Sequence, residues 1–196
     1  MKSGDVLLQR WRLSKVLPYL KEKPRVLDVG CSDGILFKRF HTEIGMGVGI
    51  DPHLTQSVEG SNYLLIPGAF PQSLQGQEPF DVITMFAVFE HVPEQETEKW
   101  ANHCQSLLKP GGHLVITVPS LLADPLLDVL KALKIIDGMD LDQHHGLSPS
   151  SVPDIFMKSG LDLIRKEKFQ LGLNNLFVFR KPLLLHLARP VRTILG

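Results

Sequence analysis

Hydrophobic positions along the chain form short continuous runs that alternate with stripes of helical spacing. The short runs predict buried strands, at residues 25–29, 47–51, 62–66, 80–86, 113–118, 161–169 and 176–180. The stripes predict amphipathic helices, one carrying Leu13, Val16, Leu17 and Leu20 and others at residues 34–41, 94–108, 121–136 and 150–159. This alternation predicts an α/β fold, a Rossmann-like, doubly wound, mostly parallel sheet with helices on both faces. A tight turn is expected at residues 109–112, where Pro110 precedes two glycines.

Composition restricts the class of protein. A chain of 196 residues is long enough for one sizeable domain, which we expect to span residues 1–182. The formal net charge is zero, so the total gives no reason to expect a nucleic-acid partner. The segment from Lys168 onward nevertheless carries five basic and no acidic residues, and residues 183–196 form a basic, apolar C-terminal tail.

Two cysteines and the absence of a long apolar run favour a reducing, cytoplasmic setting. Cys31 and Cys104 are too few for a disulfide framework. Polar residues interrupt the apolar positions near the N-terminus, and no stretch reaches the roughly 18 apolar residues that a spanning helix needs. We therefore expect neither a signal peptide nor a transmembrane helix.

The turn after the first predicted strand has the chemistry of a ligand-binding loop. It reads DVGCSDG over residues 28–34, and its glycines allow a sharp turn and close approach of a ligand. Asp51 ends the second strand, where a carboxylate can accept the two hydroxyls of a ribose. The turn holds no lysine before the helix, which excludes a phosphate-binding loop of the Gly-Lys-Ser/Thr kind. An acidic turn suits a ligand with a positive centre and no phosphate.

Four segments resemble, in order and spacing, the motifs of class I S-adenosylmethionine-dependent methyltransferases. They read VLDVGCSDG, GIDPH, PFDVITMFAVFEHVPE and LLKPGGHLVITVPS, within residues 24–120. A weaker run, HHGLSPSSVPDIFMKSGL, resembles small-molecule members such as those of quinone biosynthesis. The resemblance implies a seven-stranded sheet with an antiparallel last strand, S-adenosylmethionine as cofactor and S-adenosylhomocysteine as product. It also implies cofactor contacts at Asp28, Gly30, Cys31, Ser32, Gly34, Asp51, Pro52, Ala69, Phe70, Met85 and Phe86.

Two positions depart from the family pattern. Ser32 stands where the family often has glycine, a change that is tolerated if φ is negative there. Ala69 stands where an acid usually reaches the adenine amino group. Structural readings compete with the cofactor contacts: Asp28 would cap the following helix, Cys31 would only fill space, and Met85 and Phe86 would belong to the core.

Methyl transfer to a hydroxyl needs a group that removes its proton. Histidine titrates near neutrality, and the candidates at the expected rim of the sheet are His91, His144 and His145. Glu90 and His91 also match a pair that is often structural in the family. The spacing of Glu90, His91, His144 and His145 along the sequence is not that of a metal site, so no metal is expected.

The acceptor is expected to be a small molecule. Residues 85–88 lack the Asp/Asn-Pro-Pro-aromatic motif of enzymes that methylate bases of nucleic acids, so no nucleic-acid acceptor is expected. The apolar helix at 121–136 suggests an apolar or lipid-like acceptor or a homodimer contact. The tail suggests either weak contact with an anionic membrane surface or packing on the domain or on a second subunit. The alternatives are a non-catalytic, regulatory protein with this fold and, less favoured by the turn, a nicotinamide oxidoreductase.

Overall fold

The computed structural model describes residues 3–74, 76–120 and 148–183. The predicted helix at 121–136 lies outside the described residues, as do His144 and His145. All but the first residue of the predicted tail lie outside them as well. Within the described residues, no helix is long and apolar enough to cross a membrane.

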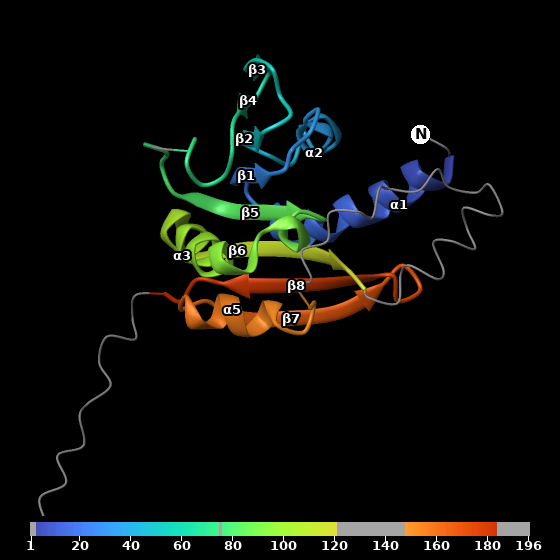
Figure 1. Ribbon diagram of the computed structural model, residues 1–196. Coiled ribbons are helices and arrows are strands. Elements are labelled where there is room, and N and C mark those ends of the chain that lie inside the picture. The colour runs from blue at the N-terminus through green and yellow to red at the C-terminus, as the bar shows by residue number, and fades with distance from the viewer. Residues whose placement is uncertain (1–2, 75, 121–147, 184–196) are drawn as a thin grey trace, which may run out of the picture.

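One mixed sheet forms the centre of the molecule (Figure 1). Its order is β3-β4-β2-β1-β5-β6-β8-β7. β1, β2, β4, β5 and β6 are parallel to one another, whereas β3 is antiparallel to β4 and β8 is antiparallel to both β6 and β7. The strands are β1 (Arg25–Val29), β2 (Met46–Asp51), β3 (Val58–Glu59), β4 (Tyr63–Pro67), β5 (Phe80–Phe86), β6 (Leu108–Pro119), β7 (Asp162–Phe169) and β8 (Asn174–Arg180).

The doubly wound α/β fold with an antiparallel last strand is confirmed, with two differences in detail. The sheet has eight strands in the described residues rather than seven, because the two-residue strand β3 folds back on β4. The residues expected as a turn at 109–112 belong to β6, which begins at Leu108. There β6 departs from regular pairing with β5, since Phe80 lies opposite Leu108 but Val82 lies opposite His113. Gly111, with φ +81°, accommodates part of this irregularity.

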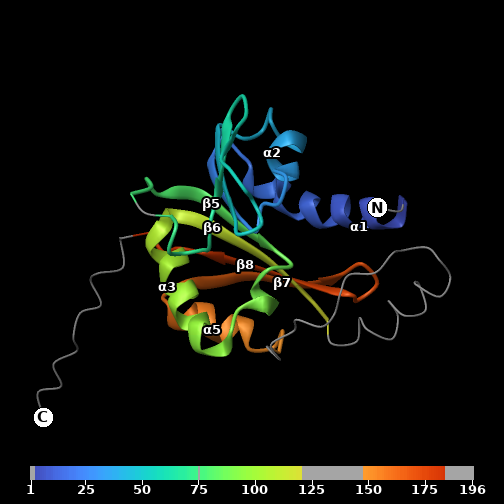
Figure 2. The same cartoon turned by 45° about the horizontal axis from the view of Figure 1, so that its top comes forward.

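Helices cover both faces of the sheet (Figures 1 and 2). α3 and α5 pack together on one face, over a core that includes Met85, Ile116 and Phe177. α1, η1 and α2 cover the other face, over a second core that includes Val16 and Phe37. The helices are α1 (Ser3–Leu13), η1 (Ser14–Tyr19), α2 (Ile35–Arg39), η2 (Phe89–His91), η3 (Glu94–Glu96), α3 (Thr97–Leu107) and α5 (Val152–Lys158).

The strand order places a topological switch between β1 and β5. β1 pairs with β2 on one side and with β5 on the other, so the connections that leave the carboxyl ends of these strands diverge. Ligands in open α/β sheets bind in the crevice formed at such a point. A ligand-binding site is therefore expected among the loops after β1, β2, β4 and β5.

Candidate cofactor site

The loop between β1 and α2 turns sharply because three of its residues have positive φ. Gly30 and Gly34 have φ +75° and +77°, and Ser32 has φ +49°. The condition under which serine would be tolerated without strain, a negative φ, is therefore not met, and Ser32 occupies the left-handed region that favours glycine. At Gly30 an added Cβ would lie 2.4 Å from Cγ2 of Val88, so this glycine allows β1 and the loop after β5 to approach each other.

Asp51, the last residue of β2, is hydrogen-bonded to the loop that follows β1. Its carboxylate accepts a hydrogen bond from the backbone N–H of Ser32 at 2.8 Å and one from the backbone N–H of His53 at 2.9 Å. The side chain is buried at the carboxyl end of β2. Each carboxylate oxygen has a second lone-pair direction, so the group can still accept hydrogen bonds from a ligand while it fixes the loop.

Asp28 lies beneath the loop and does not cap the following helix. The N-cap of α2 is Gly34, which makes no side-chain capping hydrogen bond. Asp28 instead accepts a hydrogen bond from the hydroxyl of Thr84 on β5 at 2.6 Å. Burial raises the pKa of Asp28 to about 7, the Thr84 hydrogen bond opposes this shift, and the negative charge of Asp51 adds to it. A cation bound nearby would favour the ionised form.

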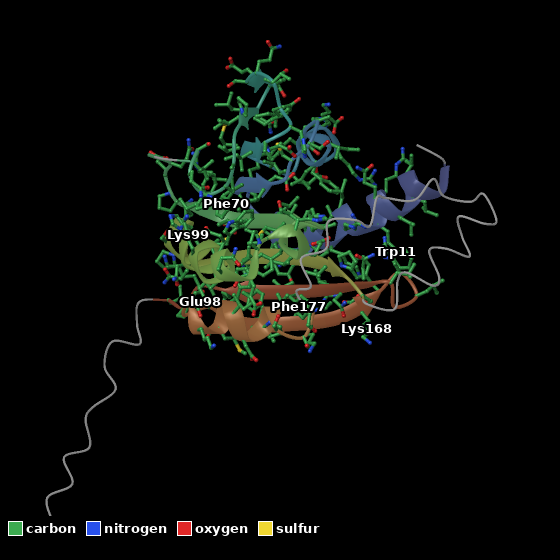
Figure 3. All side chains as sticks on the ribbon, viewed as in Figure 1. Trp11, Phe70, Glu98, Lys99, Lys168 and Phe177 are labelled. Atoms are coloured by element: carbon green, nitrogen blue, oxygen red, sulfur yellow. The ribbon has the colours of Figure 1, made fainter. Side chains whose placement is uncertain are left out.

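A pocket of about 400 Å³ opens at the carboxyl ends of β1, β2 and β5. Its volume lies in the range of small-molecule sites. One wall is polar, with Asp51 and His53, and another is aromatic, with Phe70 and Trp100 in edge-to-face contact at 4.9 Å between ring centroids. Figure 3 shows Phe70 on the same side of the molecule as Lys99 of α3, the helix that also carries Trp100.

The pocket brings together about half of the residues expected to contact the cofactor. Those that line it are Gly30, Asp51, Pro52, Ala69, Phe70 and Phe86. The loop residues Ser32 and Gly34 shape the β1–α2 turn, and Asp28 lies beneath it. The side chains of Cys31 and Met85 are buried in the second and first cores, where Cys31 packs against Gly49.

Eight residues that line the pocket were not among the site residues expected from the sequence. They are Val29, Ile50, His53, Ala87, Val88, Val92, Pro93 and Trp100. Four of them belong to the segment after β5, which turns back over the sheet at Ala87, with φ +56° and a backbone N–H that donates to the carbonyl of Thr117. This segment has no hydrophobic period, so its path was not readable from the sequence.

Of the three candidate bases, the structure describes only His91. It is exposed and lines the pocket at the end of η2. The preceding Glu90 is buried, and burial raises its pKa to about 7. Among residues 3–74, 76–120 and 148–183, no group of three or more His, Cys, Asp or Glu side chains is arranged to hold a metal ion.

Comparison with known proteins identifies the family. A family model described as a methyltransferase domain matches residues 7–166. The chain belongs to the class I S-adenosylmethionine-dependent methyltransferase family. A ubiquinone biosynthesis O-methyltransferase of Acinetobacter baumannii is 30% identical to it over 155 residues, 71% of this chain and 64% of that relative. The chain thus spans less than two thirds of that relative's length.

Solved structures of other methyltransferases share the fold. An O-methyltransferase family protein from Burkholderia thailandensis matches 92% of this chain and 58% of its own, with a TM-score of 0.67 and 17% identity. The magnesium protoporphyrin IX methyltransferase of Synechocystis, solved with bound SAH, matches 91% of this chain and 84% of its own, with a TM-score of 0.62 and 15% identity. These identities support the fold and not the substrate.

The pocket of this methyltransferase fits the cofactor class of its family. Aromatic side chains from Phe70, Phe86 and Trp100 suit a planar base, and the Asp51 carboxylate suits a pair of ribose hydroxyls. Burial raises the pKa of Asp28, and a cationic ligand bound nearby would favour its ionised form. The residues present therefore fit S-adenosylmethionine, although Ala69 offers no side-chain acceptor to an adenine amino group.

Proposed function

We propose that this chain binds S-adenosylmethionine in the pocket beside Asp51 and transfers its methyl group to an oxygen atom of a small-molecule acceptor. The observation that carries the proposal is the Asp51 carboxylate, which fixes the glycine-rich loop and faces a pocket with aromatic walls. Family membership supports methyl transfer. The name of the Acinetobacter baumannii relative supports an oxygen acceptor.

The protein contributes mainly by holding two reactants in line. The bound cofactor supplies a methyl group on a positively charged sulfur, which an attacking oxygen displaces. Asp51 and the loop after β1 would hold the cofactor, and Val88 and Val92 of the segment after β5 line the same pocket. Positioning of this kind accounts for a large share of the rate in bimolecular transfer.

His91 is the described candidate for removing the acceptor's proton, because its side chain lines the pocket. His144 and His145 are further candidates, outside the described residues. The expectation of an apolar portion of the acceptor rests on the apolar residues 121–136, which lie outside the described residues. The proposal also includes contact with a membrane surface or with a second copy of the chain. Residues 121–136 or the C-terminal tail would make that contact.

Two measurements test the proposal. Calorimetric titration with S-adenosylhomocysteine should show saturable binding to the full chain. Incubation with methyl-labelled S-adenosylmethionine and a panel of hydroxylated aromatic acceptors should then transfer the label. Binding without transfer to any acceptor would favour the alternative, a regulatory protein that kept the fold and lost catalysis.

The histidines are tested one at a time. His91→Ala, His144→Ala and His145→Ala are expected to keep S-adenosylhomocysteine binding, and the variant that lacks the base is expected to lose turnover. If all three retain the turnover of the unchanged protein, none of these histidines is the base.

A further inference from the structure

A band of polar side chains crosses the face of the sheet that lies under α1. Asp28 of β1 pairs in register with Thr84 of β5, two residues before Phe86. Phe86 in turn lies opposite Thr117 of β6, and Thr117 lies opposite Leu176 of β8, next but one to Asn174. Because alternate residues of a strand share a face, these polar side chains lie on the side of the sheet that α1 covers. Phe86 also lines the cofactor pocket, so the band adjoins that pocket.

The helix that covers the band is fixed in place. The Gln170 side chain donates to the carbonyl of Leu8 on α1 at 2.6 Å and accepts from Asn174 at 2.5 Å. One turn farther along α1, Trp11 packs edge-on against Phe169 at 6.3 Å between ring centroids. Arg12 lies four residues after Leu8 and therefore on the same side of the helix. These contacts fix the part of α1 that carries Arg12, whose charge interacts with that of Glu90 on η2.

Four buried polar atoms in this region lack a hydrogen-bond partner. They are Nε of Arg12, Oε2 of Glu90, Oγ1 of Thr117 and Oδ1 of Asn174. Buried polar groups are almost always paired, and leaving them unpaired is unfavourable. Four such atoms on α1, η2, β6 and β8 are hydrogen-bonding positions that residues 3–74, 76–120 and 148–183 leave unsatisfied.

The charges of Arg12 on α1 and Glu90 on η2 interact electrostatically. Burial lowers the pKa of Arg12, and the charge of Glu90 opposes that shift. Burial likewise raises the pKa of Glu90, and the charge of Arg12 opposes it. No ion pair joins them within the described part of the chain, so both groups keep hydrogen-bonding capacity for a ligand between them.

We propose that Arg12, Glu90 and Thr117 bind the head of the methyl acceptor, and that this head is a hydroxy acid with its hydroxyl next to a carboxylate. The proposal rests on the proposed function and names its substrate class. The unpaired Nε–H of Arg12 belongs to the edge of the guanidinium that binds carboxylates through two parallel hydrogen bonds. Glu90 and Thr117 then pair with the adjacent hydroxyl, which lies toward the cofactor pocket beyond Phe86.

The test uses the full chain saturated with S-adenosylhomocysteine and three aromatic probes in calorimetric titrations. 2-Hydroxybenzoate has the adjacent arrangement, 4-hydroxybenzoate separates the two groups, and 2-hydroxybenzyl alcohol lacks the charge. We expect 2-hydroxybenzoate to bind at least about tenfold more tightly than either of the others. Equal binding of the three probes, or no binding of 2-hydroxybenzoate while S-adenosylhomocysteine binds, would overturn the inference and leave the proposed function standing.

Matched variants assign the effect to the named side chains. Arg12→Gln and Glu90→Gln should each weaken 2-hydroxybenzoate binding by about tenfold or more while S-adenosylhomocysteine affinity is unchanged. Arg10→Gln on the exposed side of α1 and Glu94→Gln on the exposed surface of η3 are the controls and should bind as the unchanged protein does. If the Arg12 and Glu90 variants match their controls, the assignment is wrong.

A variant that does not fold and a protein that does not bind S-adenosylhomocysteine lead to different conclusions. If either of these variants fails to fold, Thr117→Val provides the same test, since it removes an unpaired hydroxyl and keeps the shape of the side chain. If the unchanged protein does not bind S-adenosylhomocysteine, the proposed function fails, and the acceptor subsite that rests on it fails too.

Discussion

The carboxylate of Asp51 accepts the backbone N–H of Ser32 at 2.8 Å, so the end of β2 holds the turn that follows β1. The two residues are 19 positions apart in the sequence. The bond keeps Ser32 in the left-handed region, at φ +49°, and it directs one edge of the Asp51 carboxylate toward the pocket. Loop shape and ligand recognition therefore depend on one side chain.

Replacing that carboxylate should weaken cofactor binding. In Asp51→Asn, one of the two backbone N–H groups of Ser32 and His53 would face an amide NH₂ in place of an oxygen. We expect S-adenosylhomocysteine affinity to fall by roughly ten- to a hundredfold, measured by calorimetry. Asp162→Asn, at an exposed position at the start of β7, is the control. Equal affinity of the two variants would contradict a role of Asp51 in binding.

Ser32→Gly should stabilise the protein. A non-glycine residue in the left-handed region costs about 1–2 kcal/mol, and part of the gain is lost because glycine orders less readily on folding. We expect the free energy of unfolding to rise by up to about 1 kcal/mol, measured by urea denaturation. Ser32→Ala keeps the strain and should show no gain. If Ser32→Gly is less stable than the unchanged protein, the serine side chain stabilises the fold by more than its backbone strain costs.

Asp28 should make both stability and cofactor affinity depend on pH. Its pKa in the folded protein, about 7, lies above the ordinary value of 3.8, so the native state holds more protons than the unfolded chain between these values. Its contribution to the free energy of unfolding therefore falls as pH rises through this window, and is fully lost above about pH 7. Affinity for cationic S-adenosylmethionine should rise over the same window, because the cation favours the ionised carboxylate.

Asp28→Asn separates the pH effect of Asp28 from that of Glu90. The pKa of Glu90 is also raised to about 7, so Glu90 changes the stability in the same direction as pH rises. The variant should unfold at a higher temperature than the unchanged protein at about pH 8, and the difference should shrink toward about pH 4. Its affinity for S-adenosylmethionine should be lower and less dependent on pH. A variant with the unchanged pH profile would show that Asp28 titrates normally.

Thr117→Val should separate stability from acceptor binding. The Thr117 hydroxyl is buried without a partner, and replacing it by a methyl group removes that desolvation cost, on the order of 1 kcal/mol. We expect the unfolding temperature to rise while 2-hydroxybenzoate binding weakens. Thr97→Val is the contrasting case, since the Thr97 hydroxyl donates to the carbonyl of Glu94 at 2.7 Å, and that variant should be destabilised. A loss of stability in Thr117→Val would indicate a structural role for the hydroxyl.

Much of the fold was predictable because it depends on local pattern. The strands β1, β2, β5 and β8 begin and end within two residues of the predicted apolar runs. The predicted first helix is less accurate, since α1 begins at Ser3 and continues into η1. The apolar stripe from Leu13 marks only the part that touches the core. Residues 3–12 carry a mixed pattern, and their helix is held partly by the tertiary contacts of Leu8 and Trp11.

The sequence by itself determined the order of strands and helices, the glycine-rich loop and the two acids at Asp28 and Asp51. These features follow from hydrophobic period and from residue chemistry at strand ends. Only the tertiary structure decided that Val88 lies against Gly30, that Met85 points into the core, and that Arg12 lies close enough to Glu90 for their charges to interact. The physical reason is that irregular loops and the docking of α1 obey long-range packing and hydrogen bonding, which leave no period in the sequence.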